Sequence, residues 1–231
     1  MSPIVRVIIP AYNEEDSIAK VIDGIPKNLV SEVIVSDNGS TDKTPEIARE
    51  AKATVLIEPV KGYGSACIKA IEYVKNLNEK TDVIVFLDGD YSDYPEEMTK
   101  IVGLLVKENL DLVIGSRALG LRQKGSMTIP QVFGNWLSTR LIRIFFGMRF
   151  TDLGPFRAIT FEKLLQLEME NKNFGWTVEM QVKAAKKKFR CKEVPISYRK
   201  RIGRSKISGT IKGTVLAGHK ILWTIFKNLR K

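Results

Sequence analysis

The 231-residue chain has few of the residues on which several protein classes depend. Its single histidine, His219, excludes a multi-histidine metal site and argues against a Ser-His-Asp triad. Its two cysteines, Cys67 and Cys191, lie far apart and form no CxxC pair, which argues against a disulfide framework or a thiolate zinc site. A metal, if one binds, must therefore be held by oxygen ligands.

Long apolar runs are also missing. No stretch reaches the roughly 18 consecutive apolar residues that a membrane-spanning helix needs. In residues 1–15, MSPIVRVIIPAYNEE, the apolar run is too short, and carboxylates follow it too soon, for a signal peptide. We therefore expect a cytoplasmic protein without a transmembrane helix.

Acidic residues are scarce in the last quarter of the chain. Residues 180–231 contain 16 Lys and Arg against one acid, Glu193, whereas the rest of the chain has 21 basic and 25 acidic residues. The net charge of +11 therefore comes from the C-terminal part. Such a basic segment is suited to bind a polyanion. The candidates are nucleic acid, an anionic membrane surface and the phosphate groups of a substrate.

The first 117 residues alternate short β-branched runs with helical patterns. Strands are predicted at 5–12, 32–37, 53–58, 82–88 and 111–116, and helices at 15–24, 44–52, 64–77 and 95–108. The alternation predicts a mostly parallel α/β sheet whose ligands bind at the carboxyl ends of its strands. Four strand ends are polar or glycine-rich, PAYNEE, SDNGSTD, EPVKGYGSA and DGDYSD, and we expect them to form one crevice.

The alternation stops after residue 117. Segment 129–147 is apolar and helical in pattern, and it suits either a core helix or a membrane-contacting one. Residues 151–159 predict a turn-rich return, 174–189 a helix and 193–201 a strand.

The segment 206–231 forms a basic amphipathic pattern. On a helical wheel one face carries Ile207, Ile211, Val215, Leu222, Ile225, Phe226 and Leu229, and the opposite face Lys206, Lys212, Lys220, Lys227 and Lys231. The pattern favours a helix in a membrane interface. The alternative is a terminal helix packed on its own domain.

Asp88-Gly89-Asp90 is the clearest candidate site. Two carboxylates one residue apart at a strand end call for a cation between them, and Mg²⁺ and Mn²⁺ prefer carboxylate and phosphate oxygens. Gly89 allows the tight turn. Asp37 and Asn38, with Lys61 and Gly62, supply hydrogen-bond partners and close backbone approach for a nucleotide, although KGYGSA matches neither a P-loop nor GxGxxG.

The ordered motifs PAYNEE, SDNGSTD, KGYGSA, FLDGDYSDYP, GSR and FR resemble those of the inverting family 2 nucleotide-sugar glycosyltransferases, which have a single Rossmann-like domain of the GT-A type. Within that family the chain looks like the polyprenyl-phosphate enzymes, such as the dolichol-phosphate mannose and glucose synthases. The resemblance implies a catalytic domain over 1–205, with a nucleotide-sugar half (1–117) and an acceptor half (118–205), followed by the amphipathic helix over 206–231.

The resemblance also implies residue roles on the donor side. Pro10, Tyr12, Glu14 and Asp37 would border the nucleotide, while Asp88 and Asp90 would bind the metal on the donor diphosphate. Ser92 replaces a glutamine that mannose synthases often carry. Ser92 would be the third metal ligand, or Asp93 would substitute for it; alternatively, Asp93 merely begins the turn into Pro95.

On the acceptor side, Arg117 would face the acceptor phosphate, and the segment RIGRSK would neutralise phosphates through Arg201, Arg204 and Lys206. A hydroxyl acceptor needs a general base, for which Asp152 is the candidate. A lipid phosphomonoester, with a second pKa of about 6, needs cations instead of a base. Asp152 would then position the acceptor or the sugar, or simply begin the turn before Gly154.

The sequence thus predicts metal-dependent inverting transfer of a hexose to a polyprenyl or dolichyl phosphate by a protein peripheral on the inner face of the cell membrane. UDP-glucose is favoured as donor, followed by GDP-mannose. The alternatives are transfer to a hydroxyl of a glycan or a diacylglycerol, and nucleic-acid binding. Trp223 and Phe226 lie in an apolar helical pattern and not on a stacking surface, so we expect no nucleic-acid partner. The lack of a spanning helix leaves room for a separate membrane-anchoring partner.

Overall fold

The computed structural model describes residues 2–203 and 211–229, with the backbone alone over 211–217. In this part of the chain a seven-stranded sheet has the order β3-β2-β1-β4-β6-β5-β7. Its strands are β1 (Val5–Ala11), β2 (Glu32–Asp37), β3 (Thr54–Ile57), β4 (Val83–Phe86), β5 (Leu112–Ser116), β6 (Arg157–Thr160) and β7 (Cys191–Pro195). Only β6 runs antiparallel to its neighbours. The predicted mostly parallel α/β sheet is confirmed.

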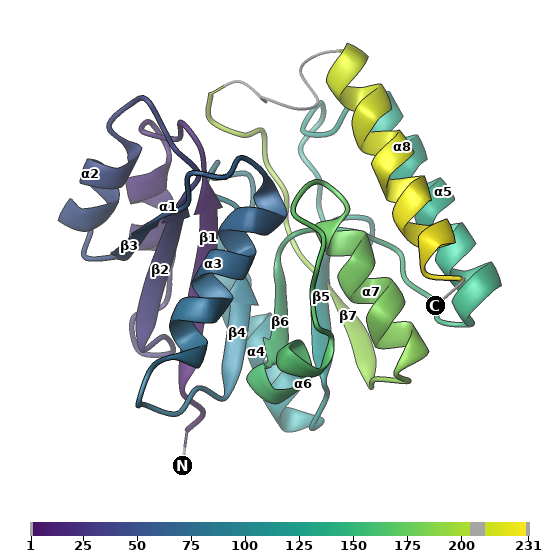
Figure 1. The fold of residues 1–231 in the computed structure, drawn as a ribbon, viewed down its shortest axis with the longest axis horizontal. Coiled ribbons are helices and arrows are strands. Elements are labelled where there is room, and N and C mark those ends of the chain that lie inside the picture. Colours follow the sequence, from purple (N-terminus) through teal and green to yellow (C-terminus); the bar gives the residue numbers. More distant parts are fainter. Residues whose placement is uncertain (1, 204–210, 230–231) are drawn as a thin grey trace.

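Helices cover both faces of the sheet, which gives three layers (Figure 1). They are α1 (Ile18–Gly24), α2 (Thr44–Glu50), α3 (Tyr63–Lys75), α4 (Met98–Lys107) with a preceding 3-10 turn (Pro95–Glu97), α5 (Ile129–Phe146), α6 (Phe161–Gln166), α7 (Trp176–Lys186) and α8 (Ile211–Lys227). Alternate residues of one strand belong to the two cores. Val7 and Ile9 lie in the core that α1, α2 and α4 cover, and Ile8 lies in the core on the opposite face, which α3, α5, α7 and α8 together cover.

The order of the strands places the crevice. β1 pairs with β2 on one side and with β4 on the other, so the chain reverses its direction of progress across the sheet at β1. Loops that leave the carboxyl ends of adjacent strands diverge at such a switch point and leave room for a ligand. The loops after β1, β2 and β4 are the motif segments predicted to meet there.

Two predictions for the second half of the chain were wrong. The predicted return over 151–159 contains the start of β6, which inserts between β4 and β5, and the unpredicted α6 follows it. The strand predicted over 193–201 lies at Cys191–Pro195, because it pairs only with the five residues of β5. Beyond Pro195 the chain leaves the sheet and crosses towards the loop after β4, where Tyr198 bridges to Asp93.

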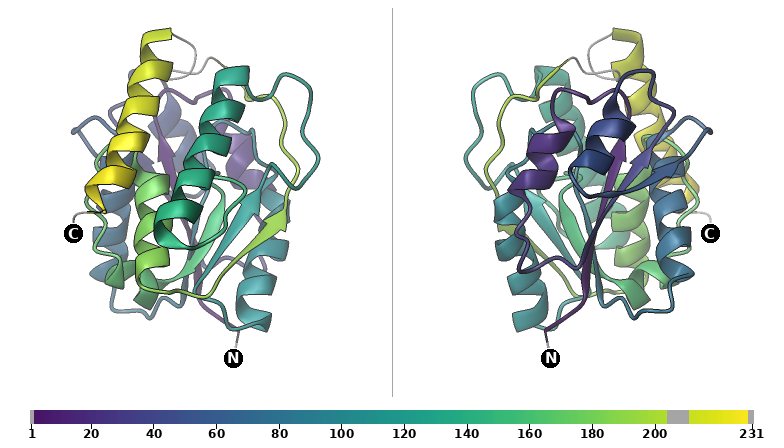
Figure 2. Two further views of the ribbon diagram at one scale, coloured as in Figure 1. Left: turned by 90° about the vertical axis from the view of Figure 1, so that its right-hand side faces the viewer. Right: turned by 90° about the vertical axis from the view of Figure 1, so that its left-hand side faces the viewer.

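Helix α8 lies beside α5 and α7 on the outer side of the domain, as Figures 1 and 2 show. Of the predicted apolar stripe, Ile225 is fully buried against the domain, whereas Phe226 and Leu229 are exposed. The helix therefore packs on its own domain with part of that stripe. The stripe's first three members and Lys206, Lys212 and Lys231 lie outside the described side chains. No described helix is long and apolar enough to cross a membrane.

Candidate active site

A cleft of about 300 Å³ opens at the carboxyl ends of β1, β2 and β4. Its lining includes nine of the ten residues predicted to bind the nucleotide sugar, which are Pro10, Tyr12, Glu14, Asn38, Lys61, Gly62, Asp88, Gly89 and Asp90. Residues from four different loops are thus brought to one place. We refer to this space as the donor cleft.

Asp37 is the predicted residue that does not line the donor cleft. It is buried, and its Oδ2 accepts hydrogen bonds from the backbone N–H groups of Gly39 and Ser40, at 3.1 Å each. Its Oδ1 is buried without a hydrogen-bond partner among the described residues. Asp37 therefore shapes the SDNGS turn, and Asn38 stands next to it in the cleft wall.

Asn38 and Lys61 fix the wall of the donor cleft. The side chain of Asn38 accepts from the backbone N–H of Gly62 at 2.7 Å and donates to the carbonyl of Val60 at 2.8 Å. The ammonium group of Lys61 donates to the carbonyl of Asn38 and lies 3.9 Å from the centre of the Tyr12 ring. The face of Tyr12 is thus held in place by a cation.

The glycines of KGYG allow a close approach between two distant segments. A Cβ atom at Gly62 would collide with the backbone of Lys172, and one at Gly64 with that of Asn171. The N-terminus of α3 therefore sits directly against the 171–173 segment. This contact brings the neighbouring Phe174 into the lining of the donor cleft.

The two carboxylates of DGD are held by different partners. Asp88 Oδ1 accepts from the hydroxyl of Tyr63 at 3.0 Å. Asp90 Oδ1 accepts from the backbone N–H and the hydroxyl of Ser92, at 2.9 and 2.5 Å. Burial, together with the nearby Asp90 carboxylate, raises the pKa of Asp88 to about 7. The charges of Arg117 and Arg201 lower this pKa but do not offset the two effects, so the neighbouring carboxylates favour a further cation.

Arg201 supplies a cation on the Asp90 side. Its Nη1 lies 3.2 Å from Asp90 Oδ2, and its Nη2 donates to Glu14 Oε1 at 2.6 Å. A positive charge is therefore already accommodated against Asp90. This observation, and the presence of a second carboxylate, Asp88, in the same cleft, fit a divalent cation bound by the two side chains. Among the described residues no group of three or more His, Cys, Asp or Glu surrounds a common point, so other ligands would come from the substrate or water.

Ser92 and Asp93, the two candidates for a third metal ligand, do not line the donor cleft. Ser92 is buried and points its hydroxyl at Asp90. Both carboxylate oxygens of Asp93 are buried without a hydrogen-bond partner among the described residues. Burial, and next the charge of Asp88, raise the pKa of Asp93 well above its ordinary value.

A second cleft of about 340 Å³ joins the first. Its lining adds residues from α5, α7, α8, the segments that precede and follow α5, and the segment after β7, namely Arg117, Met127, Pro130, Gln131, Gly134, Asn135, Leu153, Pro155, Trp176, Thr177, Tyr198, Gly218 and Ile221. Five residues line both clefts: Tyr63, Asp88, Asp90, Phe174 and Arg201. The two spaces therefore meet at the DGD carboxylates. We refer to the second as the acceptor cleft.

Arg117 and Asp152 form a buried ion pair beside the acceptor cleft. The backbone N–H and Nε of Arg117 donate to Asp152 Oδ2 at 2.7 and 2.8 Å, and its Nη2 donates to Oδ1 at 2.7 Å. Burial alone would raise the pKa of Asp152, but Arg117 outweighs it and the pKa lies below its ordinary value. Asp152 is only 1% exposed and does not line the cleft.

The backbone around Asp152 is fixed by three other elements. The Glu193 carboxylate of β7 accepts from the backbone N–H groups of Thr151 and Asp152, at 2.9 and 3.1 Å. Asn135 of α5 bonds the carbonyl of Thr151, and Gln181 of α7 bonds that of Asp152. The lone acid of the basic C-terminal quarter thus serves to hold this loop.

Several cleft residues escaped the sequence prediction. Tyr63 stands inside the quoted KGYGSA motif, and its contact with Asp88 becomes visible only in the fold. Phe174 lies just before α7, and Trp176 is the first residue of that helix. The predicted start of a helix was the only feature of the sequence that marked this position. The indole N–H of Trp176 is buried and has no acceptor among the described residues. Arg204 and Lys206, predicted to contact phosphates, lie outside the described residues.

Comparison with known proteins agrees with the motifs. Residues 6–167 match the sequence profile described as "Glycosyl transferase family 2". The chain belongs to glycosyl transferase family 2. It is 31% identical over 224 residues to the undecaprenyl-phosphate mannosyltransferase of Micrococcus luteus, covering 90% of this chain and 89% of that one. It is 33% identical over 206 residues to the dolichyl-phosphate hexose transferase of Haloferax volcanii, covering 87% and 85%.

Among solved structures, this family 2 glycosyltransferase is similar to glucosyl-3-phosphoglycerate synthase from Mycobacterium tuberculosis in complex with Mn²⁺, UDP and phosphoglyceric acid. The TM-score is 0.77 at 22% identity, over 98% of this chain and 78% of that one. The same synthase has been crystallised with Mg²⁺ and UDP. The predicted single GT-A-type domain is confirmed.

Proposed function

We propose that this family 2 glycosyltransferase moves a hexose from a nucleoside diphosphate sugar to a polyprenyl phosphate, with inversion at the anomeric carbon. The observation that carries the proposal is the meeting of the donor and acceptor clefts at Asp88 and Asp90. A diphosphate leaving on the donor side and a nucleophile arriving from the acceptor side lie on opposite faces of a sugar placed at that junction. Displacement in this geometry inverts the anomeric centre.

On the donor side we assign the nucleotide to the walls built by Tyr12, Asn38 and Lys61, with Asp37 shaping the turn beneath. Mg²⁺ or Mn²⁺ would be held by Asp88 and Asp90, and when bound it would neutralise charge on the leaving diphosphate. Ser92 holds Asp90 in orientation through its hydroxyl, a supporting role in place of the predicted ligand role.

On the acceptor side the charges favour a phosphate. Arg117 and Arg201 both line the acceptor cleft, and the ring of Tyr198 lies against the Arg117 guanidinium, 5.0 Å from its carbon to the ring centroid. Asp152 is fully engaged by Arg117, so it is poorly placed to take a proton from a hydroxyl. A phosphomonoester with a second pKa of about 6 is already ionised at neutral pH and needs no base.

The relatives support a lipid acceptor, because two of them are named for undecaprenyl phosphate and dolichyl phosphate. We propose further that the enzyme is a peripheral protein on the cytoplasmic face of the membrane. Arg204 and Lys206 belong to the proposal as further phosphate-neutralising cations of the segment that contains Arg201. UDP-glucose is our first choice of donor, supported by the fold shared with a UDP-binding glucosyl transferase, and GDP-mannose is the second.

The proposal is tested with purified protein, Mg²⁺ or Mn²⁺, labelled UDP-glucose or GDP-mannose, and dolichyl or undecaprenyl phosphate in detergent. We expect label in the lipid fraction with one donor, and none for a variant with Asp88→Asn and Asp90→Asn. Labelling of a glycan or a diacylglycerol, with an unlabelled lipid phosphate under both donors, would refute it. A thermal-shift comparison of UDP and GDP identifies the base.

A further inference from the structure

Exposed apolar side chains gather on two adjacent helices. Of the fifteen exposed large apolar side chains in the described part of the chain, nine lie on α5 or on α8 and the residue shortly after it: Ile129, Val132, Phe133, Trp136, Ile144, Phe145, Trp223, Phe226 and Leu229. These nine include every exposed Phe and Trp of the described residues. Scattered single apolar residues are normal on a surface, but a contiguous patch marks an interaction site.

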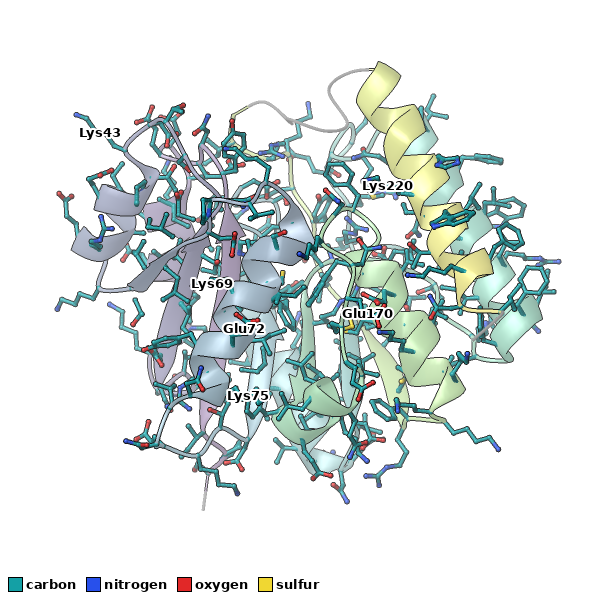
Figure 3. All side chains as sticks on the ribbon, in the orientation of Figure 1. Lys43, Lys69, Glu72, Lys75, Glu170 and Lys220 are labelled. Atoms are coloured by element: carbon teal, nitrogen blue, oxygen red, sulfur yellow. The ribbon has the colours of Figure 1, made fainter. Side chains whose placement is uncertain are left out.

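The two helices form a single face, which we call the α5–α8 face. Helices α5 and α8 run side by side in the left-hand view of Figure 2 and pack on one another. The rings of Phe145 and Phe226 meet at 5.7 Å between centroids and join the two surfaces. Aromatic side chains project from these helices away from the body of the domain in Figure 3.

The two helices carry charge of one sign. Neither contains an acidic residue, and Arg140 and Arg143 of α5 are exposed. Lys227 of α8 is also exposed but lies 3.8 Å from the carboxylate of Glu170. Trp beside Lys and Arg is the composition of segments that lie at the interface of an anionic bilayer. A second copy of the chain would place like charges against one another, which opposes self-association through this face.

The acceptor cleft opens onto the same helices. Gly134 of α5 and Gly218 of α8 both line it, together with Pro130 and Ile221. A Cβ atom at either glycine would meet no described atom within 4 Å. No described side chain therefore closes the wall of the cleft between α5 and α8 at the two glycines.

We propose that the α5–α8 face docks on an anionic lipid bilayer, and that the hydrocarbon chain of the acceptor passes from the cleft to the bilayer between α5 and α8 at Gly134 and Gly218. Docking follows from the surface alone, whereas the passage rests on the proposed function. The phosphate would then lie near Arg117 while the polyprenyl chain stays in lipid.

Docking is tested by flotation with vesicles of phosphatidylcholine, with and without phosphatidylglycerol. We expect binding to the anionic vesicles and a roughly tenfold or greater loss for the double variant Trp136→Ser, Trp223→Ser, because interfacial affinity scales with buried apolar area. The matched control is Val106→Ser, Leu165→Ser, which removes exposed apolar side chains elsewhere and should leave binding unchanged. Equal binding by the two double variants would overturn docking.

A second readout does not depend on the variants. Brominated lipid should quench the exposed Trp136 and Trp223 of the unmodified protein, while the buried Trp176 is spared. Absence of quenching would show that the face stays out of the bilayer. Mass photometry tests whether a second copy of the chain covers the face instead. If the unmodified protein is a dimer and the Trp136→Ser, Trp223→Ser variant is a monomer, the face is a dimer interface and docking is overturned.

The passage is tested with Gly218→Leu, which adds a side chain where space is open. We expect thermal stability to be kept, turnover of a long-chain polyprenyl phosphate in vesicles to fall several-fold, and turnover of a short, water-soluble isoprenyl phosphate to persist. Gly103→Leu on α4, which also faces open space, is the control. Parallel loss with both acceptors, or no loss with either, would refute the passage. No turnover by the unmodified protein with any acceptor would refute the proposed function and leave the flotation result standing.

Discussion

Arg117 and Asp152 hold each other at three points, with donor–acceptor distances of 2.7, 2.8 and 2.7 Å. The pair is buried, and Glu193, Asn135 and Gln181 fix the backbone that carries Asp152. A carboxylate in this setting orients its cation. It is not free to exchange protons, because its charged form is stabilised by the strongest partner available.

The variant Asp152→Asn separates positioning from base catalysis. Under our proposal the neutral amide side chain introduced at position 152 no longer holds Arg117 in its orientation toward the acceptor phosphate. The KM for the acceptor should therefore rise roughly tenfold, while kcat changes little. A general base contributes about 10²–10⁴-fold, so loss of a base would appear mainly in kcat. Steady-state kinetics decide the point, with melting curves as a check because breaking a buried pair costs about 3–5 kcal/mol. A kcat loss of that size with unchanged acceptor KM would favour the hydroxyl-acceptor alternative.

Metal affinity should depend on pH through Asp88. Burial raises its pKa to about 7, so below that pH the metal-free protein increasingly holds a proton that a cation must displace. The Kd for Mn²⁺ should therefore increase about tenfold per pH unit on the acid side and level off above pH of about 8. Calorimetric titration without nucleotide measures it. A Kd that stays constant between about pH 5.5 and 8 would contradict the assignment of Asp88 as a ligand.

Arg201 should compete with the metal before the donor arrives. Its Nη1 lies 3.2 Å from Asp90 Oδ2, so Arg201→Gln removes a cation from one of the two proposed ligands. We expect Mn²⁺ alone to bind roughly fivefold more tightly, the equivalent of about 1 kcal/mol. Turnover should fall nevertheless, because the donor loses a phosphate partner. Weaker binding of Mn²⁺ alone would show that Arg201 instead helps to build the metal site.

Much of the donor cleft could be predicted from sequence because parallel strands deliver their carboxyl ends to one edge. Tyr12, Asn38 and Asp88 each follow a recognisable β-branched run, so recognising the runs was enough to bring the three together. The observed ends of the strands differ from the predicted ends by a few residues, which does not change this conclusion. The side chains that line the donor cleft lie in the loops after these strands, and the alternation of strands and helices indicated where each loop falls along the chain.

The same reasoning did not correctly predict the strands of the acceptor half, residues 118–205. Strand β6 is four residues long and begins with Arg157, whose buried guanidinium donates to the carbonyls of Leu153 and Thr177. Those partners exist only after the chain has folded, so the local pattern carried no signal for a core strand. The helical wheel likewise indicated that α8 is helical but could not show that, within its apolar stripe, Ile225 packs inward while Phe226 and Leu229 are exposed.

Tyr63→Phe offers a conservative test of how the DGD site is tuned. The Tyr63 hydroxyl donates to Asp88 Oδ1 at 3.0 Å, and this hydrogen bond lowers the pKa of Asp88 against the larger effect of burial. Its loss should raise that pKa, so the pH at which Mn²⁺ binding is half lost should move upward. Tyr73→Phe removes a hydroxyl bonded to Glu32 at 2.9 Å, remote from both clefts, and should leave the profile in place. A shift to lower pH, or equal profiles for the two variants, would mean that Tyr63 does not tune the carboxylate that we assign to the metal.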